Sequence, residues 1–321
     1  MRRIKKCTVF LLVLCLLLNL AGCAAAQKPL RVTLVLKTVT EVAEFWGTLL
    51  SGVEKAAEEY GVELKVLTSP REIDIDKQIE LIRQVTADKP DVMILSAADY
   101  DRCAEATEEA IAAGIGVVAI DTDVNAAGRA CFVGSNSYEI GLEMGRAMAS
   151  YLPEGGKVAV IQHMLTTTTG IERTRGVLDA LNKAGNIEIL GSFCCDNSTE
   201  QAQTITTELL SADPEIRGFV CTNEVCNVGA ANALVELGMG GRVYVVGCDN
   251  SQRQIQFLEQ NIIQAIVTQR PFNMGYVAVQ QAVRVANGEQ TDDFVEVSCV
   301  LITRENMYTQ ENQKLLFPVL R

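Results

Sequence analysis

Polar side chains stand at the ends of several apolar, strand-like runs of this 321-residue chain. Because the carboxyl ends of parallel strands meet along one edge of a sheet, where ligands collect, these side chains are expected to share one rim. Taken singly, Asp and Asn residues at such positions also serve as helix caps and turn formers. Their recurrence after several strands favours a binding site. The residues concerned are Lys37, Asp121, Asn223, Asp249 and Gln269.

An aromatic pair, Phe45 and Trp46, opens a predicted helix, and Trp46 is the only tryptophan of the chain. The pair either fills a gap between helix and sheet or contacts a ligand. Carboxylates, amides and cations beside an aromatic face suit a neutral ligand rich in hydroxyls, because each hydroxyl both donates and accepts hydrogen bonds. The C–H face of a sugar ring also packs well on an aromatic ring. This set of residues therefore predicts a carbohydrate ligand.

The sequence offers little for catalysis or for metal binding. His163 is the only histidine and lies near the hydroxyl run 166–169, but no paired acid accompanies it, so a structural role is favoured over a catalytic one. One histidine without a Cys-x-x-Cys pair does not complete a common zinc site. Neither half has a glycine-rich nucleotide loop after its first strand. We therefore predict a binding protein that is not an enzyme and that holds no cofactor or metal.

A repeated strand–helix pattern must position these residues. Short apolar runs alternate with segments of helical periodicity, which is typical of βαβ units and parallel sheets. The pattern restarts at residue 157, so we predict an α/β protein with two Rossmann-like parallel-sheet lobes. The expected strands are 31–36, 63–68, 91–96, 116–121, 157–162, 188–193, 218–222, 242–249 and 265–269. The expected helices are 45–60, 75–87, 103–113, 170–185, 199–210 and 230–237, and one more between the last two strands.

The first residues have the layout of an export signal. Four basic residues precede an apolar stretch, and the run Leu-Ala-Gly-Cys ends at Cys23. This run resembles the lipobox of bacterial lipoproteins, where the signal is removed before an acylated cysteine. We expect residues 1–22 to be a lipoprotein signal peptide, Cys23 to carry the lipid and residues 23–29 to be a tether. An ordinary cleaved signal and a membrane anchor are the alternatives.

The charge and the cysteines limit the environment and the partners. Removal of residues 1–22 would take away four basic residues and no acid, which changes the formal charge from −12 to −16. Such a surface repels nucleic acid and anionic lipid. Eight further cysteines lie mainly in apolar, strand-like runs, where a thiol behaves as a small hydrophobic group. A reducing habitat is favoured over a disulfide framework. The eight are Cys103, Cys131, Cys194, Cys195, Cys221, Cys226, Cys248 and Cys299.

Six segments resemble type I periplasmic substrate-binding proteins of the ribose- and galactose-binding group, and the resemblance covers nearly all of the chain after the signal. The segments are FWGTLLSGVEKAAEEYG (45–61), IDTDV (120–124), GIERTRG (170–176), TNEVCNVGAANAL (222–234), VVGCDNS (245–251) and TQRPFNMG (268–275). The resemblance implies ligand contacts from Phe45, Trp46, Asp121, Arg173, Asn223, Asp249 and Gln269.

The resemblance also implies a discontinuous division of the chain. Three crossings between the lobes are expected near residues 135–136, 269–270 and 298–299. The N-terminal lobe would then comprise residues 30–135 plus 270–298, and the C-terminal lobe residues 136–269 plus 299–321. The three crossings would together form the hinge.

Several positions depart from the family pattern. Thr122 stands where the ribose binders have an arginine, Asn197 where they have an aromatic residue, and Ala43 where many relatives have an asparagine. Lys37 resembles a lysine that arabinose-binding relatives direct at the sugar, although a solvated lysine at a strand end is an equal alternative. These comparisons add Lys37, Thr122 and Asn197 to the candidate ligand-binding residues.

The resemblance implies an extracytoplasmic, lipid-anchored monomer that closes on a monosaccharide or similar polyhydroxyl compound and presents it to a membrane ABC permease. In the alternative function, the closed form docks on a membrane histidine kinase or chemoreceptor as its ligand-sensing subunit. The ligand core of LacI-type repressors shares this fold, but it requires an N-terminal helix-turn-helix where this chain has an export signal. Binding of nucleic acid is therefore not expected.

Overall fold

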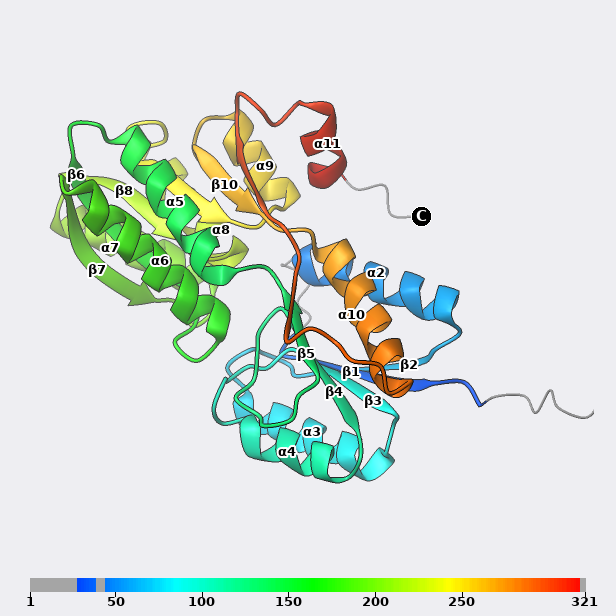
Figure 1. Cartoon of the computed structure of the whole chain (residues 1–321). Coiled ribbons are helices and arrows are strands. Elements are labelled where there is room, and N and C mark those ends of the chain that lie inside the picture. The colour runs from blue at the N-terminus through cyan, green and yellow to red at the C-terminus, as the bar shows by residue number, and fades with distance from the viewer. Residues whose placement is uncertain (1–27, 39–43, 318–321) are drawn as a thin grey trace, which may run out of the picture.

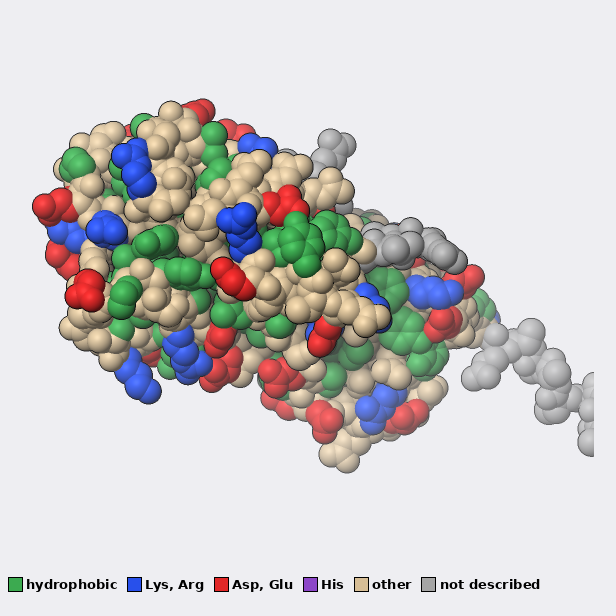
Figure 2. Space-filling model, turned by 90° about the horizontal axis from the view of Figure 1, so that it is seen from above, with side chains coloured by type: hydrophobic (Ala, Val, Ile, Leu, Met, Phe, Trp, Pro, Cys, Tyr) green, Lys and Arg blue, Asp and Glu red, His purple; other side chains and the backbone are tan. Residues whose placement is uncertain are grey.

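The structure is a computed structural model that describes residues 28–38 and 44–317. The predicted signal peptide, Cys23, most of the tether and Ala43 lie outside the described residues. Within the described part, no helix combines the length and the apolar character that crossing a membrane requires. Acidic and basic side chains are interspersed on the face shown in Figure 2.

Two six-stranded sheets, here called sheet A and sheet B, form the frame of the molecule (Figure 1). Sheet A contains β1 (Arg31–Leu36), β2 (Glu63–Thr68), β3 (Val92–Leu95), β4 (Gly116–Ile120), β5 (Cys131–Gly134) and β11 (Phe294–Glu296), in the order β11-β5-β4-β3-β1-β2. Sheet B contains β6 (Gly156–Gln162), β7 (Ile187–Cys194), β8 (Ile216–Cys221), β9 (Tyr244–Cys248), β10 (Ala265–Thr268) and β12 (Val300–Thr303), in the order β12-β10-β9-β8-β6-β7. The strands pair in parallel, except that β12 runs antiparallel to β10.

Helices cover both faces of each sheet. Sheet A lies between the pair α2 (Glu44–Tyr60) and α10 (Pro271–Ala286) and the pair α3 (Ile75–Asp88) and α4 (Ala104–Ala112) (Figure 1). Sheet B is covered by α5 (Ser137–Tyr151), α6 (Thr168–Ala184), α7 (Thr199–Ala212), α8 (Glu224–Glu236), α9 (Gln252–Glu259) and α11 (Gln310–Leu316). We call sheet A with its four helices the A lobe, and sheet B with its six helices the B lobe.

The alternation of side chains along a strand explains this layering. In β1, Leu34 and Leu36 face the core under α2 and α10, whereas Val35 faces the core under α3 and α4. In β6, Val158 and Val160 likewise face one core, and the intervening residues face another. Because successive side chains of a strand point to opposite faces, near-continuous apolar strands indicate sheets buried on both sides.

The predicted strands and helices are largely confirmed. The strands β5, β11 and β12 and the helix α11 are absent from the prediction. The sequence pattern missed α5, which follows the N-cap Asn136, and it missed α10. Helix α8 begins at Glu224 rather than at residue 230, because the side chain of Asn223 accepts a hydrogen bond from the backbone N–H of Cys226. The first turns of α8 are buried on most sides, so they show no amphipathic period.

The chain passes between the two sheets three times. It leaves β5 of sheet A for α5 of the B lobe, it leaves β10 of sheet B for α10 of the A lobe, and it leaves β11 for β12. Figure 1 shows these three connections running side by side between the lobes. The strand ends of the two sheets therefore face each other across a shared space.

Candidate functional site

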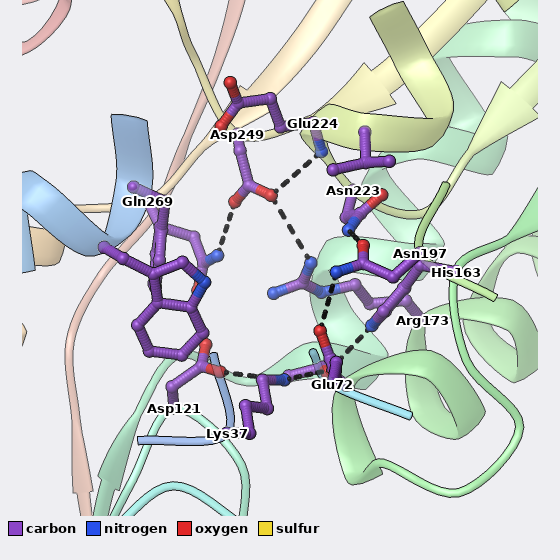
Figure 3. A pocket seen from close by; sticks show the side chains of 14 residues that line it. Lys37, Glu72, Asp121, His163, Arg173, Asn197, Asn223, Glu224, Asp249 and Gln269 are labelled. Carbon is purple, nitrogen blue, oxygen red and sulfur yellow. Dashed lines mark hydrogen bonds and ion pairs between the residues drawn. The ribbon is translucent and has the colours of Figure 1, made fainter. Parts of the chain in front are cut away.

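A narrow cavity lies between the lobes and is lined by both of them (Figure 3). Its walls come from the carboxyl ends of strands and the first turns of the helices that follow. The lining residues are Lys37, Phe45, Trp46, Glu72, Asp121, His163, Thr169, Arg173, Asn197, Asn223, Glu224, Val225, Asp249 and Gln269. Nine of the ten predicted ligand-binding residues are in this set.

Two aspartates occupy equivalent places at the ends of β4 and β9. Asp121 and Asp249 have φ angles of 62° and 69°, in the left-handed region. Asp and Asn reach this region more readily than other residues that have a Cβ atom. In both cases the backbone N–H still donates to the neighbouring strand, at Val133 and Val267 respectively. The backbone thus turns sharply at both strand ends and holds both carboxylates at the cavity.

Lys37 forms a buried ion-pair cluster within the A lobe, together with Glu72 and Asp121. Its Nζ lies 2.8 Å from Glu72 Oε1 and 3.3 Å from Asp121 Oδ2. Burial alone would lower the pKa of Lys37, but these two carboxylates outweigh burial and raise it. Of the two alternatives for Lys37, the structure thus excludes a solvated lysine, because the side chain is only 4 % exposed.

Arg173 is the buried cation of the B lobe. It comes from α6, its Nη1 donates to the carbonyl oxygen of Thr222 at 2.9 Å, and it lies 3.8 Å from Asp249 Oδ2. Burial lowers the pKa of Arg173, and nearby Cys248, Asp249 and Asp121 raise it by more. Asp249 also accepts hydrogen bonds from Gln269 Nε2 at 2.6 Å and from the backbone N–H of Glu224 at 3.2 Å.

Glu224 is a buried carboxyl at the start of α8. The residue belongs to the lining of the cavity, and Oε2 of its side chain has no hydrogen-bond partner within the described residues. Burial first, and then the charge of Asp249, raise the pKa of this carboxyl to about 8. An acid without a cationic partner in a desolvated place holds its proton to higher pH.

A chain of side-chain hydrogen bonds joins the lobes across the cavity. Asn197 donates to Glu72 Oε2 of the A lobe at 2.9 Å, and its own oxygen accepts from Asn223 at 2.8 Å. Further bonds between the lobes run from Thr166 Oγ1 to the carbonyl of Ala98 and from the backbone N–H of Asp123 to Thr168 Oγ1. The lobes are therefore in the closed arrangement.

The aromatic pair serves both of the roles that the sequence left open. Phe45 and Trp46 are 9 % and 5 % exposed and belong to the core under α2, yet both also line the cavity. Their rings meet edge to face with centroids 5.1 Å apart, and Lys37 Nζ lies 5.6 Å from the Trp46 ring. The core thus fixes an aromatic surface at the A-lobe wall.

His163 has the surroundings of a structural residue. Its two ring nitrogens lie 2.8 Å from Thr222 Oγ1 and 3.2 Å from Thr169 Oγ1. Burial first, and then Lys37 and Arg173, hold the pKa of this imidazole well below its usual range. The ring is therefore neutral at physiological pH and makes no hydrogen bond to an acid among the described residues. This arrangement suits binding and not acid–base catalysis.

The structure does not bring Thr122 to the cavity, although the sequence placed it there. Its hydroxyl donates to the carbonyl of Ala97 at 2.7 Å and lies 3.1 Å from Ser96 Oγ, inside the A lobe. Sequence reasoning missed Glu72 and Glu224. Glu72 stands four residues beyond the end of β2 at Thr68, so the strand-end rule does not reach it.

The cysteines and the acidic residues form no metal site in the described part of the chain. Among those residues, no group of three His, Cys, Asp or Glu side chains is arranged to hold a metal ion. The eight cysteines predicted to lie in the folded part are free thiols. The cavity therefore offers ion pairs, amides and an aromatic face as its means of binding.

Comparison with known proteins places this geometry in a family. Residues 33–290 match the model of the family described as periplasmic binding protein domain. The D-allose-binding periplasmic protein of Escherichia coli is 25 % identical over 303 residues, which cover 90 % of this chain and 96 % of that protein.

Solved structures show the same fold. A carbohydrate transporter solute binding protein from Agrobacterium radiobacter, in complex with D-arabinose, is 23 % identical and has a TM-score of 0.87, covering 91 % of this chain and 100 % of its own. A sugar transporter from Clostridium phytofermentans is 29 % identical with a TM-score of 0.79, covering 85 % and 98 % respectively. The chain therefore belongs to the periplasmic binding protein family, with two parallel-sheet lobes of the type I fold, and it is a solute-binding protein and not an enzyme.

Proposed function

We propose that this chain binds a monosaccharide or a similar polyhydroxyl compound between its lobes and presents it to an ABC importer in the membrane. The observation that supports this most is the cavity itself, in which paired carboxylates, cations and amides stand beside one aromatic surface. Such a set pairs the donor and the acceptor of each hydroxyl and packs the C–H face of a sugar ring. One relative is named for D-allose and another for D-ribose and D-allose, and the Agrobacterium radiobacter protein was solved in complex with D-arabinose.

The mechanism follows from the division of the site between the lobes. Asp121 and the aromatic pair belong to the A lobe, whereas Asp249, Arg173 and Asn223 belong to the B lobe. A ligand that bonds to both sets is bound better by the closed state than by the open one, and it therefore shifts the population toward closure. The importer would recognise the closed shape. We propose the hinge at the three connections, with lobes of residues 30–135 plus 270–298 and 136–269 plus 299–321.

A screen by thermal unfolding tests the proposed function. A ligand that binds only the folded state raises the midpoint by an amount that grows with its concentration relative to Kd. We expect at least one monosaccharide to raise the midpoint, and we expect amino acids and nucleosides to leave it unchanged. A rise with amino acids or nucleosides alone would reject carbohydrate binding.

We also propose that Cys23 is acylated and that the mature protein works outside the cytoplasm on a lipid tether. The support is the Leu-Ala-Gly-Cys run after a charged and then apolar segment. Cells that express the chain should incorporate labelled palmitate, and Cys23→Ala should abolish the label. Cys15→Ala is the matched control, because it removes a cysteine of the signal and not the acceptor. Equal labelling of parent and Cys23→Ala would reject the lipid anchor.

A further inference from the structure

Two of the free thiols are in direct contact inside the B lobe. The Sγ atoms of Cys195 and Cys226 lie 3.1 Å apart and share a hydrogen bond. It is the only hydrogen bond between two thiols among the residues that the structure describes. Both side chains are fully buried in the same hydrophobic core. A disulfide joins sulfurs about 2.05 Å apart, so the pair lies about 1 Å from bonding distance.

Backbone hydrogen bonds fix the positions of both cysteines. Cys195 follows β7, and its N–H donates to the carbonyl of Gln162, the last residue of β6, at 2.9 Å. Cys226 lies in the first turn of α8, and its N–H donates at 3.0 Å to Oδ1 of Asn223, the N-cap of that helix. The two cysteines are 31 positions apart in the chain. The fold therefore brings them together, and not their place in the sequence.

The two thiols differ in their readiness to lose a proton. The hydrogen bond from Cys226 lowers the pKa of the Cys195 thiol, whereas burial raises the pKa of the Cys226 thiol. The thiolate is the form that attacks in thiol–disulfide exchange. Cys195 is therefore the sulfur that reacts first, and Cys226 is the one that follows.

We propose that Cys195 and Cys226 form a disulfide as the chain folds outside the cytoplasm, with a small-molecule disulfide such as oxidised glutathione as the oxidant. The Cys195 thiolate attacks one sulfur of the oxidant, forms a mixed disulfide and releases one small thiolate. Cys226 then loses its proton and attacks Cys195 Sγ, which forms the protein disulfide and releases the second small thiolate. Two protein thiols are oxidised, and one small disulfide is reduced to two thiols that take up the two protons. Because both thiols are buried in the folded state, the reaction precedes complete burial.

This bond would fix two amides of the B-lobe wall. Asn197 follows Cys195 by two residues, and Asn223 precedes Cys226 by three. Their side chains meet at the cavity, where Asn223 Nδ2 donates to Asn197 Oδ1 at 2.8 Å. The disulfide would hold the same two segments together from the core, with or without a ligand. In reducing surroundings the thiols stay free, and only the amide contact joins the segments at the cavity.

Refolding of the full chain in detergent tests for the bond. The reduced protein is unfolded in urea and diluted into a mixture of reduced and oxidised glutathione, circular dichroism follows refolding, and the remaining thiols are alkylated. Trypsin with a glutamate-specific protease cuts after Glu224 and so separates Cys226 from Cys221. We expect mass spectrometry to find Cys226 linked to the peptide of Cys195, in the parent and in Cys194→Ala. Free thiols at both positions, or a link from Cys195 to Cys221, would overturn the proposal.

The unfolding midpoint provides a second test. A disulfide constrains the unfolded chain, so the parent refolded with oxidised glutathione should unfold about 5–10 °C above the parent refolded with dithiothreitol. Cys195→Ala and Cys226→Ala should each lose this difference. Cys194→Ala is the matched control, because Cys194 adjoins Cys195 but bonds to the carbonyl of His163 and to Asp196, and it should keep the difference. A difference that persists in Cys226→Ala would reject this pair.

Hydrogen exchange tests the effect on the cavity wall. The backbone amides of residues 195–198 and 223–226 should exchange about tenfold or more slowly in the oxidised protein than in the reduced one, because the bond opposes separation of the two segments. The amides of β3 in the A lobe should not change. Equal exchange of the two segments in both states would show that the bond does not fix the wall. These measurements need no sugar, so their outcome is independent of the proposed carbohydrate binding.

Discussion

The two walls of the cavity differ in chemistry. The A-lobe wall has the aromatic pair and a lysine whose carboxylate partners come from the same lobe. The B-lobe wall has Arg173, Asp249, His163 and two asparagines, and no Phe, Tyr or Trp of the described B lobe lines the cavity. A ligand that fits both walls has one apolar face and one face rich in hydrogen-bonding groups. The aromatic surface comes from the A-lobe wall, and closure adds the hydrogen-bonding groups of the B-lobe wall to it.

The largest effect is expected for Glu224, an acid of the B-lobe wall (here the B wall; the A-lobe wall is the A wall), and it concerns the pH dependence of stability. The pKa of Glu224 is raised from 4.5 to about 8, so the folded closed state retains a proton that the unfolded chain loses at lower pH. Stability from this group is complete below about pH 4.5 and is lost as pH rises toward 8, by at most about 1.4 kcal/mol per pH unit. We expect the free energy of unfolding of the parent to fall relative to that of Glu224→Gln across this range.

Urea unfolding at several pH values measures this dependence. The comparison with Glu224→Gln removes the contribution of all other titrating groups. If the free energies of unfolding of parent and variant change with pH in the same way, the pKa of Glu224 is not raised in the folded state. The contrast between this acid of the B-lobe wall and the paired Lys37 of the A-lobe wall would then be wrong.

The next effect compares the equivalent aspartates of the two walls. Asp121→Asn and Asp249→Asn keep the side-chain shape and tolerate the left-handed backbone at these positions, so both variants should fold. Each change replaces a charged hydrogen-bond acceptor of the binding site by a neutral amide. We expect the affinity for the ligand to fall by about 2 kcal/mol, or about 30-fold. Calorimetry with the tightest sugar of the screen measures the change.

Asp196→Asn is the control for these two variants. Asp196 also has a left-handed φ, of 48°, but its side chain is exposed and does not line the cavity. It should bind like the parent. Loss of affinity in only one of the two cavity variants would show that the ligand engages a single wall.

A smaller effect is expected from the contact that joins the walls directly. Asn197→Gly removes the amide that bonds to Glu72 and to Asn223, and glycine accepts the φ of 54° at this position. Loss of one or two neutral hydrogen bonds should weaken binding by about 1 kcal/mol, or about fivefold. Asp196→Gly has the same backbone freedom and keeps the bridge, so it isolates the amide. Equal affinities of the two variants would assign no role to the bridge.

The sequence was sufficient for most of the fold and most of the lining. Strand ends such as those at Asp121 and Asp249 are visible as polar residues after apolar runs, and the parallel-sheet rule gathers them at one rim. The pattern missed α5, although its buried residues Ile140, Met144 and Met148 follow helical spacing. The helical periodicity is therefore present in the sequence, and our interpretation overlooked it.

The two glutamates of the site, Glu72 and Glu224, could not be predicted from the sequence in this way. Glu72 follows β2, an edge strand whose side chains are mostly exposed or half-buried, so a glutamate after it resembles a solvated loop residue. Its tertiary contacts include Lys37 and Asn197, and the side chain is buried. Glu224 similarly resembles an ordinary acid in the first turn of a helix. Thr122 shows the opposite error, since a family position was carried over and the side chain points into the A lobe.

The central claim is that one ligand contacts both walls, and a fluorescence titration tests it most directly. Trp46 is the only indole and lies in the A wall, whereas Asp249 lies in the B wall. Titration of the parent with its tightest sugar should change the Trp46 emission, and Asp249→Asn should reach the same final emission at a midpoint about 30-fold higher. A tight ligand that leaves Trp46 emission unchanged, or an unchanged midpoint in Asp249→Asn, would contradict binding between the two lobes.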